Sequence, residues 1–383
     1  MVNITEWDPD QVTLTDDSVD DAWKTCVLQG VYYGDNEYNG SLGARISSIF
    51  VILFVSTAFT IFPLLARTFK RLKMPLYVYL FARYFGAGVI VATAFIHLLD
   101  PAYSEIGGQS CVGSTGNWAI YSWCPAIILL SIVVIFLVDV ASDAYVERKY
   151  GIGNNSGHGG NNEIMKAVVR GGGGNENGHV HDHNEDGENA PSPQDLENKK
   201  DLKSDVGSLS DTSTLGSEKE FRSQISAFLV LEFGIIFHSV MIGLNLGSVG
   251  DEFKTLYIVL VFHQSFEGLG IGARLSAIPW PSHISYVWAY LLCIAYGLVT
   301  PIAVAIGLGV RTTYISSSYN ANIVSGVLDA ISAGILIYTG LVELLARDFI
   351  FEKTYKKDLK QLLFMIFSLL WGAGLMALLG KWA

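Results

Sequence analysis

Two histidines and a glutamate stand inside long apolar stretches of this sequence. His263 and Glu267 are four residues apart in Phe-His-Gln-Ser-Phe-Glu-Gly, and His238 lies in the preceding apolar stretch. Residues four apart share one face of a helix. Ionisable side chains are costly inside a membrane and usually mark a site or a pathway. We therefore interpret these three side chains as ligands for a metal ion.

A short connector at residues 247–253 would make the two stretches antiparallel neighbours. Counted from that connector, His238 and His263 lie at nearly the same depth, so their imidazoles and the Glu267 carboxylate would converge near the membrane midplane. Two nitrogens and an oxygen suit zinc better than magnesium or calcium. The alternative interpretation is that each histidine is a hydrogen-bonded packing residue.

Membrane-spanning helices must position these residues. The chain is 50% hydrophobic and only 16% charged, with a mean hydropathy of +0.37. Uncharged runs long enough to cross a bilayer predict an all-α integral membrane protein with eight spans. The spans are centred on residues 46–66, 76–99, 118–138, 225–247, 255–273, 284–309, 322–345 and 362–380.

These spans divide into a group of three and a group of five. Residues 1–44 form an acidic tail, 45–149 hold the first group, 150–221 form a polar loop expected to be disordered, and 222–383 hold the second group. Lysines and arginines collect in the connectors after the first and seventh spans, so both termini are expected outside and the polar loop in the cytoplasm. No removable signal peptide is expected. The net charge of -11 offers no basic face for nucleic acid.

Other polar residues would line a route through the membrane. Thr93, His97 and Asp100 fall on one face at the outer end of the second span, which we interpret as a shelf leading to the site. The alternative is an interfacial histidine with an aspartate capping the helix end. Three further intramembrane acids are either pathway residues or partners in salt bridges: Glu232, Asp329 and Glu343.

The polar loop carries imidazoles on alternate residues, which an extended chain could wrap around zinc as a weak, exposed site for sensing or buffering. They are His179, His181 and His183.

Cysteines fall mainly on the predicted outer side. A disulfide between Cys111 and Cys124, or between either of them and Cys26, is expected, and the sequence leaves the pair open.

Glycines four residues apart mark close helix contacts in the two spans that carry the candidate ligands. The steps are Gly243 to Gly247 and Gly268 to Gly272. Backbones can approach closely at such steps. That closeness would let short side chains from different helices reach one metal.

Together these features resemble the ZIP (Zrt/Irt-like protein) transporters, over nearly the whole chain. The resemblance rests on the eight-span layout, the histidine-containing loop after the third span, and the motifs His238-Ser-Val-Met-Ile-Gly243 and His263-Gln-Ser-Phe-Glu-Gly268. It is strongest to the fungal plasma-membrane zinc uptake transporters. It implies Zn²⁺ import into the cytosol as transported substrate, a multi-pass protein of the plasma membrane, a binuclear-type metal centre between the fourth and fifth spans, and a homodimer.

The resemblance also implies roles for single residues. His238 and Glu267 match primary-site ligands. The adjacent second site is matched by Ser239, His263 and Gln264. His97 matches the family's histidine at the outer part of the second span. Ile242 stands where members with a full second site carry a bridging acid, and Gln264 stands where an acid is often found. A single well-formed site is therefore expected.

Other function classes remain open at this point. A carrier of broader divalent metals, such as Fe²⁺ or Mn²⁺, would use the same ligands. A membrane zinc hydrolase would hold a catalytic metal, but the sequence has no His-Glu-x-x-His pair, and we predict that the protein is not an enzyme. A metal-sensing receptor is favoured only by the histidine-containing loop.

Overall fold

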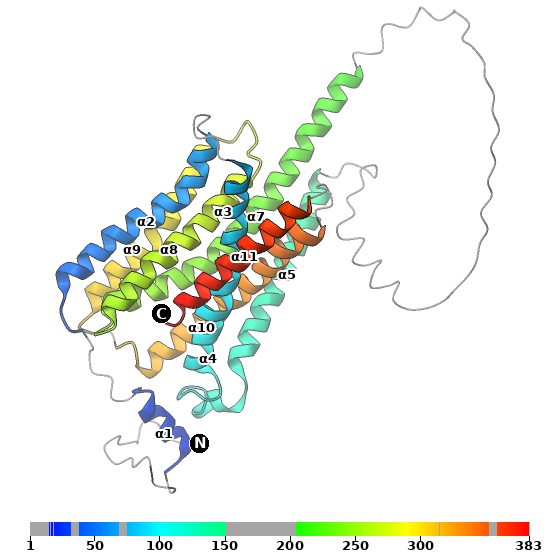
Figure 1. The fold of residues 1–383 in the computed structure, drawn as a ribbon. Helices are drawn as coiled ribbons and strands as arrows, with labels where there is room; N and C mark the ends of the chain where they lie inside the picture. Colours follow the sequence, from blue (N-terminus) through cyan, green and yellow to red (C-terminus); the bar gives the residue numbers. More distant parts are fainter. Residues whose placement is uncertain are drawn as a thin grey trace, which may run out of the picture.

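The computed structural model describes residues 15, 17, 19–31, 38–68, 75–150, 204–313, 315–351 and 358–382. Every regular element in these ranges is helical, and eight helices are long and apolar enough to cross a membrane. Figure 1 shows them running side by side in one bundle. The predicted all-α membrane fold is confirmed.

The spans follow the predicted order along the chain, with two of them built from successive helical segments. They are α2 (Leu42–Thr68), α3 (Leu76–Ala92) continued by η4 (Thr93–Leu99) and α4 (Asp100–Ile106), α5 (Trp123–Tyr150), α7 (Ser204–Ser248), α8 (Phe253–Ala277), α9 (Val287–Val310), α10 (Tyr319–Tyr338) continued by η6 (Thr339–Phe351), and α11 (Leu359–Leu379). Two short helices precede or connect spans, α1 (Asp21–Leu28) and η5 (Gly116–Ile120).

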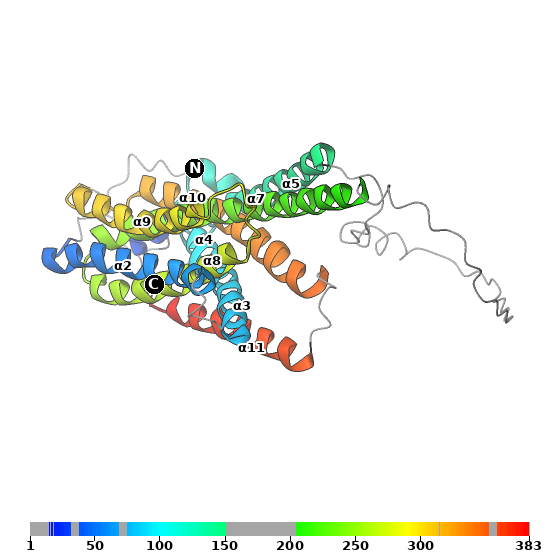
Figure 2. The same cartoon turned by 90° about the horizontal axis from the view of Figure 1, so that it is seen from above.

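The helices pack in pairs that define two groups. α2 lies along α8 and α9, and α7 lies along α9, whereas α3 packs on α11 and α5 packs on α10. Contacts of α3 with α8 and of α7 with α10 join the groups. Seen from above, α8 lies between α2 and α3 (Figure 2). The helices that carry the candidate ligands are thus enclosed by other spans.

One end of the bundle carries Arg67, Arg274 and Arg347, close to the ends of α2, α8 and η6. We call it the basic end. Because α7 and α8 are joined by residues 249–252 at the opposite end, a lower residue number in α7 and a higher one in α8 both lie nearer the basic end.

α7 is much longer than predicted. It begins at Ser204, so residues 204–221, which the sequence pattern assigns to an irregular loop, are helical. Side chains one turn apart extend the helix, because Arg222 binds Glu218 at 2.8 Å and Gln224 donates to Glu220 at 3.0 Å. Residues 151–203, with the three-histidine motif, lie outside the described residues, as do residues 1–14 of the acidic tail.

The glycine steps do form close contacts, but with flanking helices. A methyl group added at Gly243 would lie 2.6 Å from the Cβ of Ala303 on α9, and one at Gly268 would lie 2.6 Å from Oγ1 of Thr60 on α2. α7 is therefore seated on α9, and α8 on α2. The ligand-bearing helices are positioned by these two neighbours rather than by a glycine contact with each other.

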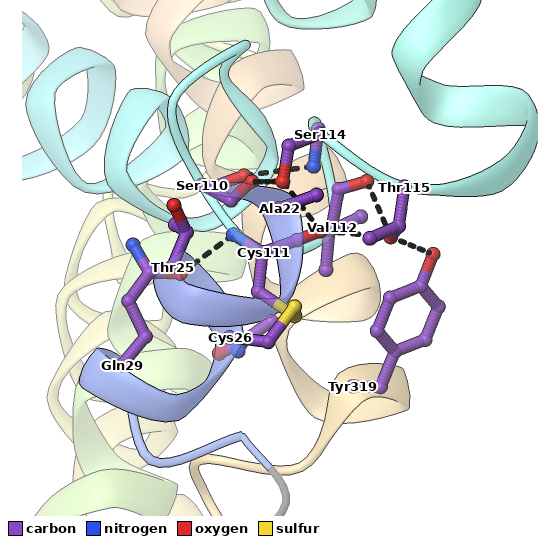
Figure 3. Close-up of a disulfide and its surroundings, with 12 residues drawn as sticks. Ala22, Thr25, Cys26, Gln29, Ser110, Cys111, Val112, Ser114, Thr115 and Tyr319 are labelled. Atoms are coloured by element: carbon purple, nitrogen blue, oxygen red, sulfur yellow. Dashed lines mark hydrogen bonds between the residues drawn. A yellow bond between two sulfur atoms is a disulfide. The ribbon is translucent and has the colours of Figure 1, made fainter. Parts of the chain in front are cut away.

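A disulfide ties α1 to the loop that follows α4. It joins Cys26 to Cys111, and Gln29 accepts a 2.7 Å hydrogen bond from the backbone N–H of Cys111 (Figure 3). Of the pairings that the sequence left open, this is the one the structure forms, and Cys124 is a buried free thiol. α1, which carries Cys26, lies at the end of the bundle opposite the basic end (Figure 1).

A buried arginine contacts the ligand-bearing helices at the end of the bundle opposite the basic end. Arg45, at the start of α2, is 0% exposed, and its guanidinium donates to the backbone carbonyls of Leu246, Gly247 and Val249. The carbonyls of Leu246 and Gly247 belong to the last turn of α7, where C=O groups have no partner within the helix, and that of Val249 begins the connector. The same guanidinium lies 4.5 Å from the ring centroid of Phe253, the first residue of α8.

Candidate metal site

The trio predicted from the sequence comes together between α7 and α8. Nε2 of His238 lies 3.3 Å from Nε2 of His263, and the latter lies 3.7 Å from Oε2 of Glu267. The three residues are 2%, 3% and 0% exposed. Two donors on one tetrahedral zinc, each about 2.0–2.1 Å from the metal, lie about 3.3–3.4 Å apart. The spacing of these donor atoms is therefore close to what one zinc ion requires.

Local sequence explains why they meet. The connector between α7 and α8 is only a few residues long, so the two helices are antiparallel. His238 and His263 therefore lie at the same depth in the bundle. Glu267 follows His263 by one turn and faces the same way. The depth match expected from counting residues is found.

His97 approaches from the second span. Its ring centroid lies 5.0 Å from that of His263 and 6.5 Å from that of His238. It sits in η4, a π-helical segment of a type that is rare and often found at functional sites. Nε2 of His97 lies 3.1 Å from the carbonyl oxygen of Met376 on α11. If Nε2 donates to that carbonyl, Nδ1 keeps its lone pair for a cation, a common arrangement for metal-binding histidines.

A tyrosine from α9 completes the surroundings of the glutamate. The hydroxyl of Tyr296 lies 3.1 Å from Oε2 of Glu267 and 3.2 Å from Oε1 of Gln264, and donates to both. Gln264 is 0% exposed and also accepts a hydrogen bond of 3.3 Å from Ser56 on α2. Sequence reasoning missed Tyr296 and Ser56, because single tyrosine and serine residues are ordinary within apolar spans and carry no spacing signal.

Several buried polar atoms around this cluster have no hydrogen-bond partner within the described part of the chain. They are Nδ1 of His238, Oγ of Ser239, Nε2 of Gln264 and Oε1 of Glu267. Buried polar atoms are normally satisfied, so such a concentration needs an explanation such as a bound ion or water. The donor set of imidazole, amide, hydroxyl and carboxylate groups fits a borderline divalent cation.

The side chains do not stand in a finished coordination shell. Among the residues that the structure describes, no three His, Cys, Asp or Glu side chains form a ready ligand group. Nε2 of His238 and Nε2 of His263 lie within hydrogen-bonding distance of each other, so a cation that binds both would replace this contact. A site that assembles on binding and comes apart on release has this property.

The three residues of the shelf expected in the second span differ in their burial. Thr93 and His97 are buried, whereas Asp100 is exposed. The expectation used α-helical spacing, but η4 has π-helical hydrogen bonds and more residues per turn, which changes the relative directions of these side chains. The hydroxyl of Thr93 donates to the carbonyl of Val89 in its own helix. The structure thus brings His97 to the cluster, and Asp100 lies exposed at the start of α4.

The remaining candidates are divided between partnered and unpartnered acids. Glu343 binds Arg347 at 2.9 Å, in line with the salt-bridge alternative. Asp329, 5% exposed, and Glu232, 8% exposed, each have a carboxylate oxygen with no partner in the described ranges. Ile242, at the position of the family's bridging acid, packs against an apolar cluster that includes Leu246.

Known proteins that are similar to this chain are named as zinc or zinc-regulated transporters. The sequence model of a family described as "ZIP Zinc transporter" matches residues 42–380. "Zinc-regulated transporter 1" of Saccharomyces cerevisiae is 61% identical over 390 residues, covering 100% of both chains. The Schizosaccharomyces pombe protein of the same name is 40% identical, covering 95% of this chain and 91% of its own. "Zinc-regulated transporter 2" of Saccharomyces cerevisiae is 36% identical, covering 96% of this chain and 98% of its own.

Proposed function

Because this chain belongs to the ZIP family of zinc transporters, we propose that it imports Zn²⁺ from the outside into the cytosol through a site between α7 and α8. His238, His263 and Glu267 are the ligands of that site in this proposal. The observation that carries it is the convergence of their donor atoms, at separations of 3.3 and 3.7 Å, in a fully buried place.

The chemistry of these ligands suits a transported ion. Two neutral imidazoles and one carboxylate offset only part of the charge of Zn²⁺, so the ion is held less firmly than by four thiolates. A carrier must bind its substrate tightly enough to select it and loosely enough to release it. His97 and Gln264 lie beside these ligands and are proposed to complete the coordination as the ion enters, with Ser239 next to His238.

Alternating access supplies the movement. In this scheme groups of helices rock around a fixed midplane site and expose it to one side at a time. The direction follows from the positive-inside rule, which assigns the basic end, with Arg67, Arg274 and Arg347, to the cytosol. Both termini are then outside, where an oxidising environment suits the disulfide between Cys26 and Cys111.

Other parts of the proposal rest on the family resemblance. They are a homodimer and a plasma-membrane location. A single metal site is proposed instead of the family's binuclear-type centre, because Ile242 replaces the bridging acid and packs in apolar surroundings. The relatives are named transporters, which favours transport over the zinc hydrolase that uses the same ligand types.

The test is uptake of radioactive zinc by sealed vesicles that contain the purified full-length protein. Glu267→Ala should abolish uptake while the protein still folds and inserts. Glu252→Ala is the matched control, because Glu252 is exposed in the connector before the same helix. Normal uptake by Glu267→Ala would remove the central ligand and refute the proposed site. Competition by Fe²⁺ and Mn²⁺ in the same vesicles separates a zinc carrier from a broader one.

A further inference from the structure

Glu232 lies between the candidate metal site and the basic end of the bundle. It precedes His238 by six residues in α7, a rise of about 9 Å, whereas Glu267 follows His263 by four residues in α8, a rise of about 6 Å. Because the helices are antiparallel and the two histidines are level, both carboxylates are displaced towards the basic end. Their depths differ by only about 3 Å.

The two carboxylates lie within electrostatic range of each other, and each has an oxygen without a hydrogen-bond partner among the described residues. Glu232 is close enough to Glu267 and Tyr296 to interact with both electrostatically. Tyr296 engages Oε2 of Glu267, which leaves Oε1 of Glu267 without a partner in the described structure, as is Oε2 of Glu232. Two ionised carboxylates repel strongly in a weakly polar interior, and each unsatisfied oxygen costs free energy. A cation between them would remove both penalties.

Two other acids described near the basic end are paired with arginines. Asp348 makes a two-pronged contact with Arg83 at 2.7 and 3.0 Å, and Glu343 binds Arg347 at 2.9 Å. A carboxylate held by an arginine has less negative charge to offer a passing ion. Glu232 has no such contact among the described residues, although it is nine-tenths buried. It is therefore the acid best prepared to receive an ion that leaves Glu267.

We propose that Glu232 is a second carboxylate ligand for the transported cation, which takes the ion from Glu267 as it moves towards the basic end. The inference rests on the proposed function and adds a step to it. Glu267 binds the ion together with the two histidines, and its Oε1 and the Oε2 of Glu232 share the ion during transfer. Loss of Glu232 should then slow delivery without emptying the central site.

The experiment compares zinc binding with zinc transport in the same preparations of full-length protein. Glu232→Gln keeps the size of the side chain and removes its charge, and Glu232→Asp keeps the charge. Equilibrium Zn²⁺ binding is measured on the purified protein, and the maximal rate and half-saturating concentration are measured in vesicles. Asp139→Asn is the matched control, because Asp139 is also on the half of its span nearer the basic end and its hydrogen bond from Tyr338, 2.8 Å, can be accepted by an amide.

For Glu232→Gln we expect a binding constant within about threefold of the parent and a maximal rate at least about tenfold lower, equivalent to about 1.4 kcal/mol in the barrier. Glu232→Asp should restore part of the rate, and Asp139→Asn should behave as the parent. A parental rate in Glu232→Gln would overturn the inference. Loss of zinc binding in that variant would also overturn it, because Glu232 would then belong to the central site.

A second variant guards against misfolding, and the Glu267 variant separates the role of Glu232 from that of the central site. If Glu232→Gln does not fold, Glu232→Met, a neutral side chain of similar length, takes its place with the same two decisive outcomes. Normal zinc uptake by Glu267→Ala would refute the proposed central site itself. A parental transport rate in Glu232→Gln is a different result, because it refutes the role of Glu232 and leaves the requirement for Glu267 intact.

Discussion

Removing one oxygen atom from Tyr296 tests how the metal site is held in shape. Tyr296→Phe keeps the ring, which is 2% exposed, and deletes the hydroxyl that contacts Oε2 of Glu267 at 3.1 Å and Oε1 of Gln264 at 3.2 Å. Glu267 keeps its place in the sequence of α8 but loses a hydrogen-bond donor in a fully buried position. The carboxylate is then free to take other orientations.

The expected loss follows from two independent magnitudes. A hydrogen bond to a charged group contributes about 1.5–3 kcal/mol. Removing a partner that orients a metal ligand lowers metal affinity by about 10- to 100-fold, which corresponds to about 1.4–2.8 kcal/mol. The two ranges overlap almost completely. We therefore expect zinc affinity to fall by about 10- to 100-fold in Tyr296→Phe, with the donor atoms of Glu267 still present.

The measurement is competition for Zn²⁺ between purified protein and a chelator, together with the zinc concentration that gives half-maximal uptake in vesicles. Tyr290→Phe is the control, because Tyr290 is on the same helix and its hydroxyl contacts Oγ1 of Thr68 at 3.0 Å in an exposed place. The control should bind zinc as the parent does. A Tyr296→Phe protein whose zinc affinity stays within about threefold of the parent, well short of the expected range, would refute the idea that this hydroxyl orients the ligand.

Three further perturbations test the framework around the site. Arg45→Ala leaves buried carbonyls at the end of α7 without donors, which costs about 1–3 kcal/mol for each carbonyl. The thermal unfolding midpoint in detergent should therefore fall clearly, and an unchanged midpoint would contradict this role of Arg45. Gly243→Ala should destabilise the protein by about 1–3 kcal/mol by forcing α7 from α9, whereas Gly374→Ala, with nothing within 4 Å, should not, and equal stabilities would count against close packing there. Leu28→Cys, at an exposed position of α1, should be labelled by a membrane-impermeant maleimide added outside intact cells, and labelling only after the membrane is opened would reverse the assigned orientation.

The amino-acid sequence alone predicted the membrane fold because a bilayer imposes a simple rule. Each span must be an uncharged helix of sufficient length, and that pattern is local in the chain. The meeting of His238 and His263 was predictable for a similar reason, since a short connector forces two helices of known length to be antiparallel. The spacing of four between His263 and Glu267 then placed the carboxylate on the same face.

Prediction from helical spacing and hydropathy failed at two places. One is a π-helical segment, and the other is a helix that extends through a polar stretch. The π-helical turns of η4 change the spacing around His97, so the α-helical periodicity used to place its neighbours on one face does not hold there. α7 begins at Ser204, and its polar part carries contacts such as Glu218 with Arg222, which a hydropathy pattern does not report. Neither feature has a distinctive composition.

Only the tertiary structure decided which residues from distant helices surround the trio. His97, Tyr296 and Ser56 reach it from three other spans, and Arg45 holds the end of α7 from the start of α2. The partner of Cys111 was settled in the same way, because three cysteines on one side allow several pairs and only their positions select one. Sequence spacing determines which side chains share a helix face, but the packing of helices, set by their glycines and by buried polar contacts, determines which faces meet.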